Sequence, residues 1–378
     1  MRLSDAESEL RERAASFADE RVKPSAVEHE RTGKHPTDIV RAAAREGLTT
    51  SSLPAEYGGG GLGITGSLLV REELYAADPG IAEAITGSMF GCEIIAEDGS
   101  EEQAERWVRP VSNGEAITGA AMTEPRGGSD FANIETQARR DRDEYVLNGN
   151  KIFIGNGHIA DAVLVFARTS DTDPPHRGIS SFIVEAGTDG FHRKEVEGYV
   201  GPGAMALGEL TLEGVRVPVE ARVGEEGDGF YQAMRTMNGS RLEIAASSIG
   251  AARGALDHAI EYISDRETFG KPVKDRQAVR HRIANYEARI EALRTFTYKT
   301  ARDLEEDVDL AEEPAMAKLL AAQLAEEVAS DAIQLHGGYG LLDEHRVEEY
   351  LRWSKIAQIY DGTNEVMRSI IAESVLDE

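Results

Sequence analysis

The hydrophobic pattern of this chain changes its period twice along the sequence. Apolar residues recur at helical spacing up to about residue 115, alternate in short runs over 116–224, and return to helical spacing over 225–378. A helix brings side chains back to one face about every 3.6 residues and a strand every second residue, so the two patterns need different elements. The sequence therefore predicts a helical domain at 1–115, a β domain at 116–224 and a bundle of roughly four helices at 225–378.

Two local patterns mark the N-terminal part. Ser4 and Glu7 have the spacing of a helix capping box. Gly61, Gly63 and Gly66 match G-x-G-x-x-G, but the preceding segment SSLPAEY contains a proline and has no β pattern. A dinucleotide-binding fingerprint requires a buried strand at that point, so we do not interpret these glycines as one.

Further signals lie in the middle and C-terminal parts. Asn148-Gly149 separates the β-like runs 145–147 and 151–154, and this dipeptide favours a tight hairpin. Alanine-rich residues 315–335 indicate a third helix of the bundle, and residues 345–372 indicate a fourth.

The charge balance excludes some classes of partner. The 68 acidic and 41 basic residues give a formal charge of −27, which would repel nucleic acid. An anionic ligand would be repelled too, so its site must supply local positive charge. Such an acidic surface is typical of a protein from a salt-rich, halophilic cytosol, where screening weakens the repulsion, although an acidic mesophilic enzyme is the alternative. Cys92 is the only cysteine, so we expect a buried filler with no disulfide and no metal site.

No segment indicates a membrane protein. Charged residues interrupt the apolar stretches within about 10 residues, and a helix needs roughly 18 to cross a bilayer. The first residues, MRLSDAESELRERAASF, have acids and arginines at helical spacing and no apolar core like that of a signal peptide. We therefore expect a cytoplasmic protein.

Three segments have residue types suited to binding or catalysis. MTEPRGGSD at 122–130 combines hydroxyl groups with glycines that let backbone N–H groups approach a ligand closely. DRETFG at 265–270 offers a guanidinium for a pyrophosphate and an aromatic ring for a base. Near the C-terminus, QLHGGYG and IYDGTNEVMR place glycine turns around one acid, Asp361. Each segment alone is also compatible with an ordinary turn, a surface arginine or a core aromatic residue.

The order and spacing of these segments together resemble the acyl-CoA dehydrogenase family over essentially the whole chain. The matching segments are EYGGGGLG, MTEPRGGSD, NGNKIFIGNG, Ser240-Arg241, RETFGKPVKDRQA, QLHGGYG and IYDGTNEVMR. The resemblance implies an α+β multidomain fold with an N-terminal all-α domain, a middle antiparallel β-barrel-like domain and a C-terminal four-helix bundle. It also implies FAD as cofactor, an acyl-CoA thioester as substrate, an electron-transfer flavoprotein as partner, and a homotetramer, with a dimer as the alternative.

The resemblance assigns site residues by motif. It implies Asp361 as the base that removes the α-proton of the thioester. The residues implied to contact FAD are Met122, Thr123, Ser129, Phe153, Ile154, Gly155, Arg266, Phe269, Gln277, Gln334, Gly338, Thr363 and Glu365. Those implied to contact the acyl-CoA are Ser129, Asn238, Arg241, Tyr360 and Gly362. The set from Arg266 to Gly338 matches positions that hold the adenosine diphosphate end of FAD across a subunit boundary.

The sequence departs from the family pattern near the expected reaction centre. The usual base is glutamate, and Asp361 is one methylene shorter; the other position for a base is Ser240, which has no acid group. Phe153 replaces a tryptophan, Gly155 replaces a residue with a hydroxyl group, and Gly203 replaces a basic residue. The alternatives to α,β-dehydrogenation are therefore a variant reaction on the same fold, namely oxidation by dioxygen, an unusual elimination or enoyl-CoA reduction, or a flavin-binding assembly protein without catalysis.

Overall fold

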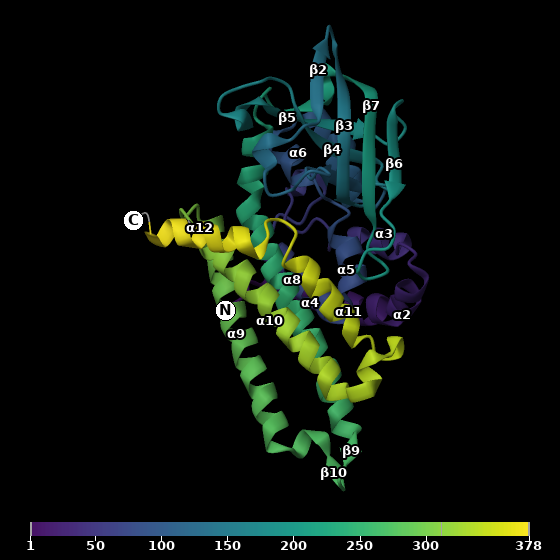
Figure 1. Cartoon of the computed structure of the whole chain (residues 1–378), viewed down its shortest axis with the longest axis vertical. Coiled ribbons are helices and arrows are strands. Elements are labelled where there is room, and N and C mark those ends of the chain that lie inside the picture. Colours follow the sequence, from purple (N-terminus) through teal and green to yellow (C-terminus); the bar gives the residue numbers. More distant parts are fainter. Residues whose placement is uncertain (1, 311, 377–378) are drawn as a thin grey trace.

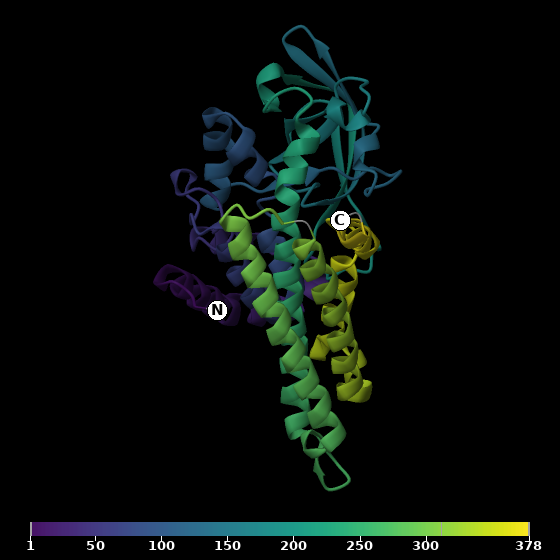
Figure 2. The same cartoon turned by 90° about the vertical axis from the view of Figure 1, so that its left-hand side faces the viewer.

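The computed structural model describes residues 2–310 and 312–376, with helices at both ends of the chain and a β-sheet between them (Figure 1). The predicted fold class is confirmed. In Figure 1 the sheet forms the broad upper part of the molecule, and long helices extend to a narrow lower end. Figure 2 shows the C-terminal helices side by side along the long axis.

The N-terminal part is helical up to the first strand. Its helices are α1 (Asp5–Phe17), α2 (Lys23–Thr32), α3 (Thr37–Arg45), α4 (Gly63–Ala77), α5 (Pro79–Thr86), α6 (Cys92–Asp98) and α7 (Glu101–Ser112). The capping box is confirmed, because Glu7 N–H donates to Ser4 Oγ (3.3 Å) and Ser4 N–H donates to the Glu7 carboxylate (2.7 Å). The G-x-G-x-x-G segment follows a 3-10 turn (Ala55–Tyr57) and leads into α4, so it is not a dinucleotide-binding turn after a strand.

The middle part is one mixed, open sheet of eight strands. The strands are β1 (Thr118–Ala121), β2 (Gln137–Asp141), β3 (Glu144–Gly155), β4 (Ala162–Arg168), β5 (Ile179–Glu185), β6 (Phe191–Glu195), β7 (Leu207–Pro218) and β8 (Arg222–Val223). Their order is β6-β7-β3-β2-β4-β5-β8, with β1 paired to β4. Within the described residues the sheet does not close into the expected antiparallel barrel: β4 pairs in parallel with β1 and β2, and β6 and β8 lie at the two ends.

The hairpin expected at Asn148-Gly149 is wrong. Strand β3 continues through this dipeptide and pairs with β7, with a register shift between Leu147 and Asn148. A Cβ on Gly149 would overlap Thr136, and Asn148 Oδ1 accepts a hydrogen bond from Gly214 N–H (2.8 Å). The dipeptide therefore forms an irregularity inside a long strand, where glycine allows close approach of a neighbouring segment.

The C-terminal part begins with a helix of 37 residues, α8 (Gly229–Asp265). It is followed by the hairpin β9 (Glu267–Thr268) and β10 (Lys271–Pro272), then α9 (Gln277–Glu305), α10 (Glu313–His336), α11 (Val347–Ala357) and α12 (Asn364–Leu376). The single helix expected over 345–372 is thus two helices. Asp361 (φ 49°) and Gly362 (φ 94°) have left-handed backbone conformations, which a right-handed helix cannot contain.

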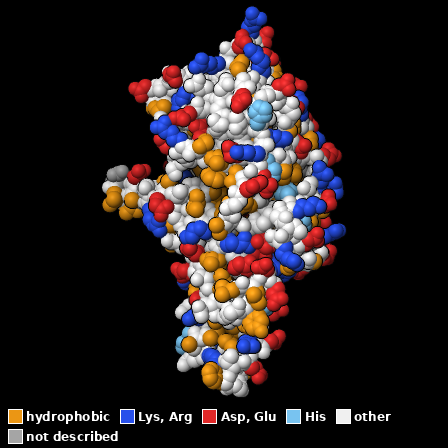
Figure 3. Space-filling model, turned by 45° about the vertical axis from the view of Figure 1, so that its right-hand side comes forward, with side chains coloured by type: hydrophobic (Ala, Val, Ile, Leu, Met, Phe, Trp, Pro, Cys, Tyr) orange, Lys and Arg blue, Asp and Glu red, His pale blue; other side chains and the backbone are white. Residues whose placement is uncertain are grey.

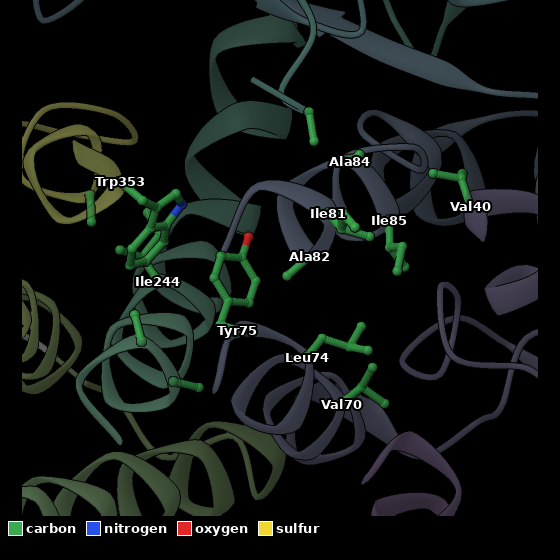
Figure 4. Packing of buried hydrophobic residues seen from close by; sticks show 14 of the residues in the cluster. Val40, Val70, Leu74, Tyr75, Ile81, Ala82, Ala84, Ile85, Ile244 and Trp353 are labelled. Carbon is green, nitrogen blue, oxygen red and sulfur yellow. The ribbon is translucent and has the colours of Figure 1, made fainter. Parts of the chain in front are cut away.

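The N-terminal helices and the bundle share one apolar core (Figure 4). Figure 4 shows side chains from α3, α4, α5, α8 and α11 converging, and the rings of Tyr75 and Trp353 lie 4.8 Å apart between centroids. Helix α4 packs closely on α8, because a Cβ on Gly250 or Gly254 would overlap the carbonyl oxygens of Glu72 and Ala76, respectively. These glycines let the two backbones meet.

A second apolar cluster lies between α6, α7 and the sheet. It contains Cys92, which is buried and free as expected, and burial raises the pKa of its thiol to about 12. In the described ranges, no group of three or more His, Cys, Asp or Glu side chains is arranged to hold a metal ion. None of the helices in residues 2–310 and 312–376 is long and apolar enough to cross a membrane.

Substitution of Gly254 by alanine is expected to destabilise the protein by about 1–3 kcal/mol, because the methyl group would push α4 away from α8. The matched control is Gly239→Ala in the same helix, where the nearest atom to the added Cβ is Ile64 Cδ1 at 3.6 Å. The control should be unchanged or more stable by up to about 1 kcal/mol, since alanine favours helix. Urea unfolding of both variants measures the difference, and equal midpoints would contradict the close-packing argument.

Candidate active site

Asp361 lies in the break between α11 and α12, beside the first third of α8. Its Oδ2 accepts a hydrogen bond from Ser240 Oγ (2.5 Å). The sequence motif placed an acid here without a partner, and the structure supplies a hydroxyl donor from 121 residues away. A carboxylate fixed by one oxygen keeps the other oxygen available for a ligand.

Lys318 of α10 holds the break in place. Its side chain is fully buried, and Nζ donates to Gly362 O (2.8 Å) and lies 3.4 Å from Asn364 Oδ1. Burial lowers the pKa of this amine to about 8, and the charge of Asp361 opposes the shift. The Lys318 amine therefore stabilises the left-handed turn at Asp361 and Gly362 by donating a hydrogen bond to its backbone.

Asn238 and Arg241 lie on the turn of α8 that carries Ser240. Arg241 Nη1 donates to Asn238 Oδ1 (2.9 Å), and within the described residues its buried Nε has no partner. Burial lowers the pKa of Arg241, while the negative charge of Asp361 raises it. The structure thus brings Asn238, Arg241 and Asp361 together as predicted, with Tyr360 next to the acid in sequence.

The expected flavin-contacting segment is joined to strand β3. Lys151, which is fully buried, donates from Nζ to Met122 O (3.0 Å) and Glu124 Oε1 (2.9 Å). Ile152 N–H donates to Thr123 O (3.0 Å). Met122 and Thr123 are therefore held rigidly beside β3, and both remain partly exposed.

Phe153, Ile154 and Gly155 occupy the end of the same strand. Phe153 has a left-handed backbone (φ 58°) and 57% of its surface is exposed, next to a register shift between β3 and β7. Ile154 is buried, so only its backbone can contact a ligand. A Cβ on Gly155 would lie 3.1 Å from Phe90 Cε2, so a larger residue here would require the Phe90 ring to shift. An exposed aromatic ring in a strained conformation fits a surface that a flat ligand covers.

A separate pocket of about 520 Å³ lies at the opposite end of α8. Arg266, Gln334 and Gly338, three of the residues expected to contact FAD, line it together with Tyr262 and Tyr339. The Arg266 guanidinium lies 5.9 Å from the centre of the Tyr339 ring, an arrangement suited to an anionic group next to an aromatic ring.

The remaining predicted residues are more dispersed. Phe269 is 97% exposed at the tip of the β9–β10 turn, and Gln277 is exposed at the first position of α9. Ser129 is exposed in the loop after β1. Thr363 Oγ1 accepts from Val366 N–H (3.3 Å) at the start of α12, so that side chain already has a local structural role.

The two ends of the predicted cofactor site are far apart in one chain. Ser240 and Arg266 are 26 residues apart, 25 of them along α8, so at about 1.5 Å per residue they lie roughly 39 Å from each other. That distance exceeds the length of one FAD molecule. Residues at both ends have suitable chemistry, but a single protomer cannot bring them to the same FAD.

Comparison with known proteins identifies the family. Models of the acyl-CoA dehydrogenase N-terminal, middle and C-terminal domains match residues 4–115, 119–215 and 227–376, respectively. The chain belongs to the acyl-CoA dehydrogenase family. It is therefore related to oxidoreductases.

Three similar proteins illustrate the family relationship. The chain is 35% identical to an acyl-CoA dehydrogenase of Bacillus subtilis (strain 168), covering 100% of this chain and 99% of the relative. It is 33% identical to the caffeyl-CoA reductase-Etf complex subunit CarC of Acetobacterium woodii, covering 100% of both. The structure of butyryl-CoA dehydrogenase from Megasphaera elsdenii matches with a TM-score of 0.95 and 34% identity over 100% of this chain and 99% of that chain.

Some residues of the candidate site were not predicted from the sequence. Lys318 was one; its only signal is a lysine within an otherwise apolar, alanine-rich helix. Tyr339 and His336 also line the far pocket. Both lie inside QLHGGYG, but the sequence prediction from this motif included only Gln334 and Gly338. Glu93 was also missed.

Glu93 lies on α6, one helical turn before Glu97, which pairs with Arg235 of α8 (3.7 Å). It is half-buried, and within the described residues its carboxyl has no hydrogen-bond partner. Burial raises the pKa of Glu93 to about 8, and the negative charges of Glu243 and Asp361 add to the shift.

Glu93→Gln is expected to become more stable relative to the wild type as pH rises from about 4.5 to about 8. Folded protein keeps the Glu93 proton up to about pH 8, whereas the unfolded chain releases it near 4.5, so a rise in pH across this interval favours unfolding. Glutamine has no proton to release. Thermal midpoints of both proteins across this range test the prediction, and parallel pH curves would show that Glu93 ionises normally in the folded state.

Proposed function

We propose that this chain is a cytoplasmic, FAD-dependent acyl-CoA dehydrogenase that converts an acyl-CoA into the trans-2-enoyl-CoA and passes the electrons to an electron-transfer flavoprotein. The observation that supports this most directly is the Asp361 carboxylate, fixed by Ser240 (2.5 Å) in a rigid helix break beside Arg241. The name of the relative CarC, a subunit of a complex with Etf, supports the partner. The proposal includes domain limits of 1–115, 116–224 and 225–378.

Asp361 acts as the base in this reaction. Oδ2 is engaged by Ser240, and within the described residues Oδ1 is not, so Oδ1 takes the proton from the α carbon. The backbone N–H of Asp361 has no acceptor in the described part of the chain, and it donates to the thioester oxygen as negative charge develops there. FAD, when bound, supplies the two-electron acceptor that no side chain provides. Loss of the α-proton and of the β-hydrogen with its electron pair leaves the new double bond.

Asn238 and Arg241 hold the CoA side of the substrate. The unpartnered Nε of Arg241 is a free donor, and its positive charge attracts a phosphate despite the acidic surface. Ser129, Tyr360 and Gly362 complete this set by their motif positions.

A second candidate is the reverse direction, reduction of an enoyl-CoA. The relative CarC is named as a reductase subunit, and the same acid and donors would serve, with Asp361 delivering the α-proton. The substrate consumed under turnover conditions decides between the two directions. Dehydrogenation consumes a saturated acyl-CoA, whereas reduction of an enoyl-CoA consumes a reduced flavoprotein.

Asp361→Asn is expected to lower the rate of flavin reduction by roughly two to four powers of ten, because asparagine keeps the N–H donor but cannot accept the proton. Anaerobic stopped-flow with acyl-CoA measures the rate, and FAD content should not change. Asp361→Glu is the companion: if the site has adjusted to the shorter acid, it is slower than wild type, since about 1 Å of misplacement can cost on the order of a hundredfold. A wild-type rate in Asp361→Asn would place the base elsewhere.

The adenosine diphosphate end of FAD binds in the far pocket of a second protomer. Arg266, Gln334 and Gly338 line that pocket, and Phe269 and Gln277 follow its lining residues Thr268 and Val273 closely in the sequence. By their motif positions, the residues that hold the flavin ring are Met122, Thr123, Phe153, Ile154 and Gly155, and Thr363 and Glu365 lie toward the pyrophosphate. Figure 3 shows hydrophobic side chains gathered on the narrow end of the molecule, and Phe269, Leu341 (74% exposed) and Leu342 belong to that end. Exposed apolar residues of this kind favour assembly, as a homotetramer or a dimer.

Arg266→Ala is expected to weaken FAD binding by about ten- to a hundredfold, the cost of one charged hydrogen bond. Fluorescence titration of FAD-depleted protein measures the affinity, and Arg31→Ala, which removes an exposed arginine of α2, is the control for loss of charge.

Assembly of the wild type should increase from dilute buffer to molar KCl. The reason is that subunits with a formal charge of −27 repel each other across the interfaces unless salt screens the charge, as expected of a halophilic protein. A complete oligomer in dilute buffer by sedimentation would contradict the halophilic interpretation, and unchanged FAD affinity in Arg266→Ala would contradict the pocket assignment.

A further inference from the structure

A buried ion pair lies beside the candidate base. Glu243 follows Ser240 by three residues on α8, so both side chains lie on the same face of the helix, and Ser240 contacts Asp361. Glu243 Oε2 accepts from Arg71 Nη2 of α4 at 2.9 Å. The two side chains are only 9% and 7% exposed, respectively.

Ser67 completes this pair. Its Oγ donates to Glu243 Oε1 (2.5 Å), and Arg71 Nε donates to Ser67 Oγ (3.3 Å). The charges of Arg71 and Glu243 therefore compensate each other and have hydrogen-bond partners, so both groups can remain ionised inside the protein.

Polar groups continue from this pair toward the residue that precedes the base. Tyr75 lies one turn beyond Arg71 on α4, and its hydroxyl donates to Glu83 Oε2 (2.8 Å). Trp353 Nε1 (3.0 Å) and Tyr360 (3.4 Å) donate to the same oxygen. Burial raises the pKa of Glu83.

If Asn238 and Arg241 hold the CoA side of the substrate, as proposed above, the acyl side meets a different face of α8. Asn238 and Arg241 form one face, and Ser240 and Glu243 form another, since residues three apart lie side by side. An acyl chain that extends from the base away from Asn238 and Arg241 therefore meets the ion pair.

A hydrocarbon chain gains little in such surroundings. Each methylene buried in an apolar pocket improves binding by about fourfold. Against an ion pair the same methylene displaces water from charged groups without replacing their hydrogen bonds, and this cost exceeds the gain from burying the methylene.

We propose that the Ser67, Arg71 and Glu243 network forms the end of the acyl-binding region and restricts the substrate to short acyl chains. This inference rests on the proposed function. It assigns Arg71 and Glu243 as specificity-determining residues, although neither takes part in the chemical step.

The first test is a series of straight-chain thioesters with the wild-type holoenzyme, from butanoyl-CoA to octanoyl-CoA. We expect kcat/KM to fall as the acyl chain is lengthened from butanoyl-CoA to octanoyl-CoA. A wild type that uses octanoyl-CoA as well as butanoyl-CoA overturns the inference and leaves the proposed function intact. If no acyl-CoA reduces the flavin, the proposed function fails, and this inference fails with it.

The second test replaces the network by apolar residues of similar volume, Ser67→Ala, Arg71→Met and Glu243→Leu together. Removing all three avoids an unpaired buried charge, and such replacements of a whole buried pair are often tolerated. The ratio of kcat/KM for octanoyl-CoA to that for butanoyl-CoA is expected to rise by roughly tenfold or more. The upper limit of this rise is about fourfold multiplied once for each added methylene.

The matched control is Glu73→Leu with Arg253→Met. This pair also joins α4 to α8 and is partly buried, but Arg253 is 13 residues beyond Ser240, about 20 Å along the helix. The control should leave the chain-length ratio unchanged. An equal rise in both variants, or no rise in the triple variant with full FAD content, overturns the inference; if the triple variant fails to fold, the wild-type series decides.

Discussion

The close packing of α4 against α8 is the constraint on which the rest of the structure depends. Gly250 and Gly254 expose only backbone to α4, so the two helices approach until the carbonyl oxygens of α4 touch α8. With that contact fixed, Ser240 lies opposite Asp361, the proposed base, and Glu243 lies opposite Arg71 of α4. The same helix ends at Asp265, and the next residue, Arg266, lines the far pocket. One packing contact thus sets the geometry at both ends of the molecule.

Positively charged side chains lie at the places where the acidic surface would otherwise repel an anionic ligand. Lys318 holds the left-handed turn that presents Asp361, and the cost of burying its amine is offset by the hydrogen bond to Gly362 O. Arg241 and Arg266 lie in the two regions proposed to bind phosphate-containing ligands, where local positive charge is needed to offset the net charge of −27. Strained backbone at Asp361 persists because this network determines it.

The fold class was predictable because hydrophobic periodicity is a local signal that repeats many times in each part of the chain. The sequence predictions were wrong where the same one or two residues are compatible with more than one backbone structure. Asn148-Gly149 favours a hairpin, but in the structure Gly149 lets Thr136 approach a continuous strand. Periodicity continued through Asp361, whose left-handed conformation depends on contacts outside its own segment. The openness of the sheet was likewise decided by strand pairing, which the period does not encode.

By itself, the sequence determined the order of the three parts, the capped first helix and the motif positions that bring Asn238, Arg241 and Asp361 into one site. These depend on spacing along the chain or on a colinear series of motifs. The tertiary structure alone decided that Arg71 meets Glu243, 172 residues away, and that Lys318 lies behind the base. The physical reason is that a charged side chain has many possible partners in a sequence that contains 109 charged residues. Only the packing of the helices selects the partner that is buried with it.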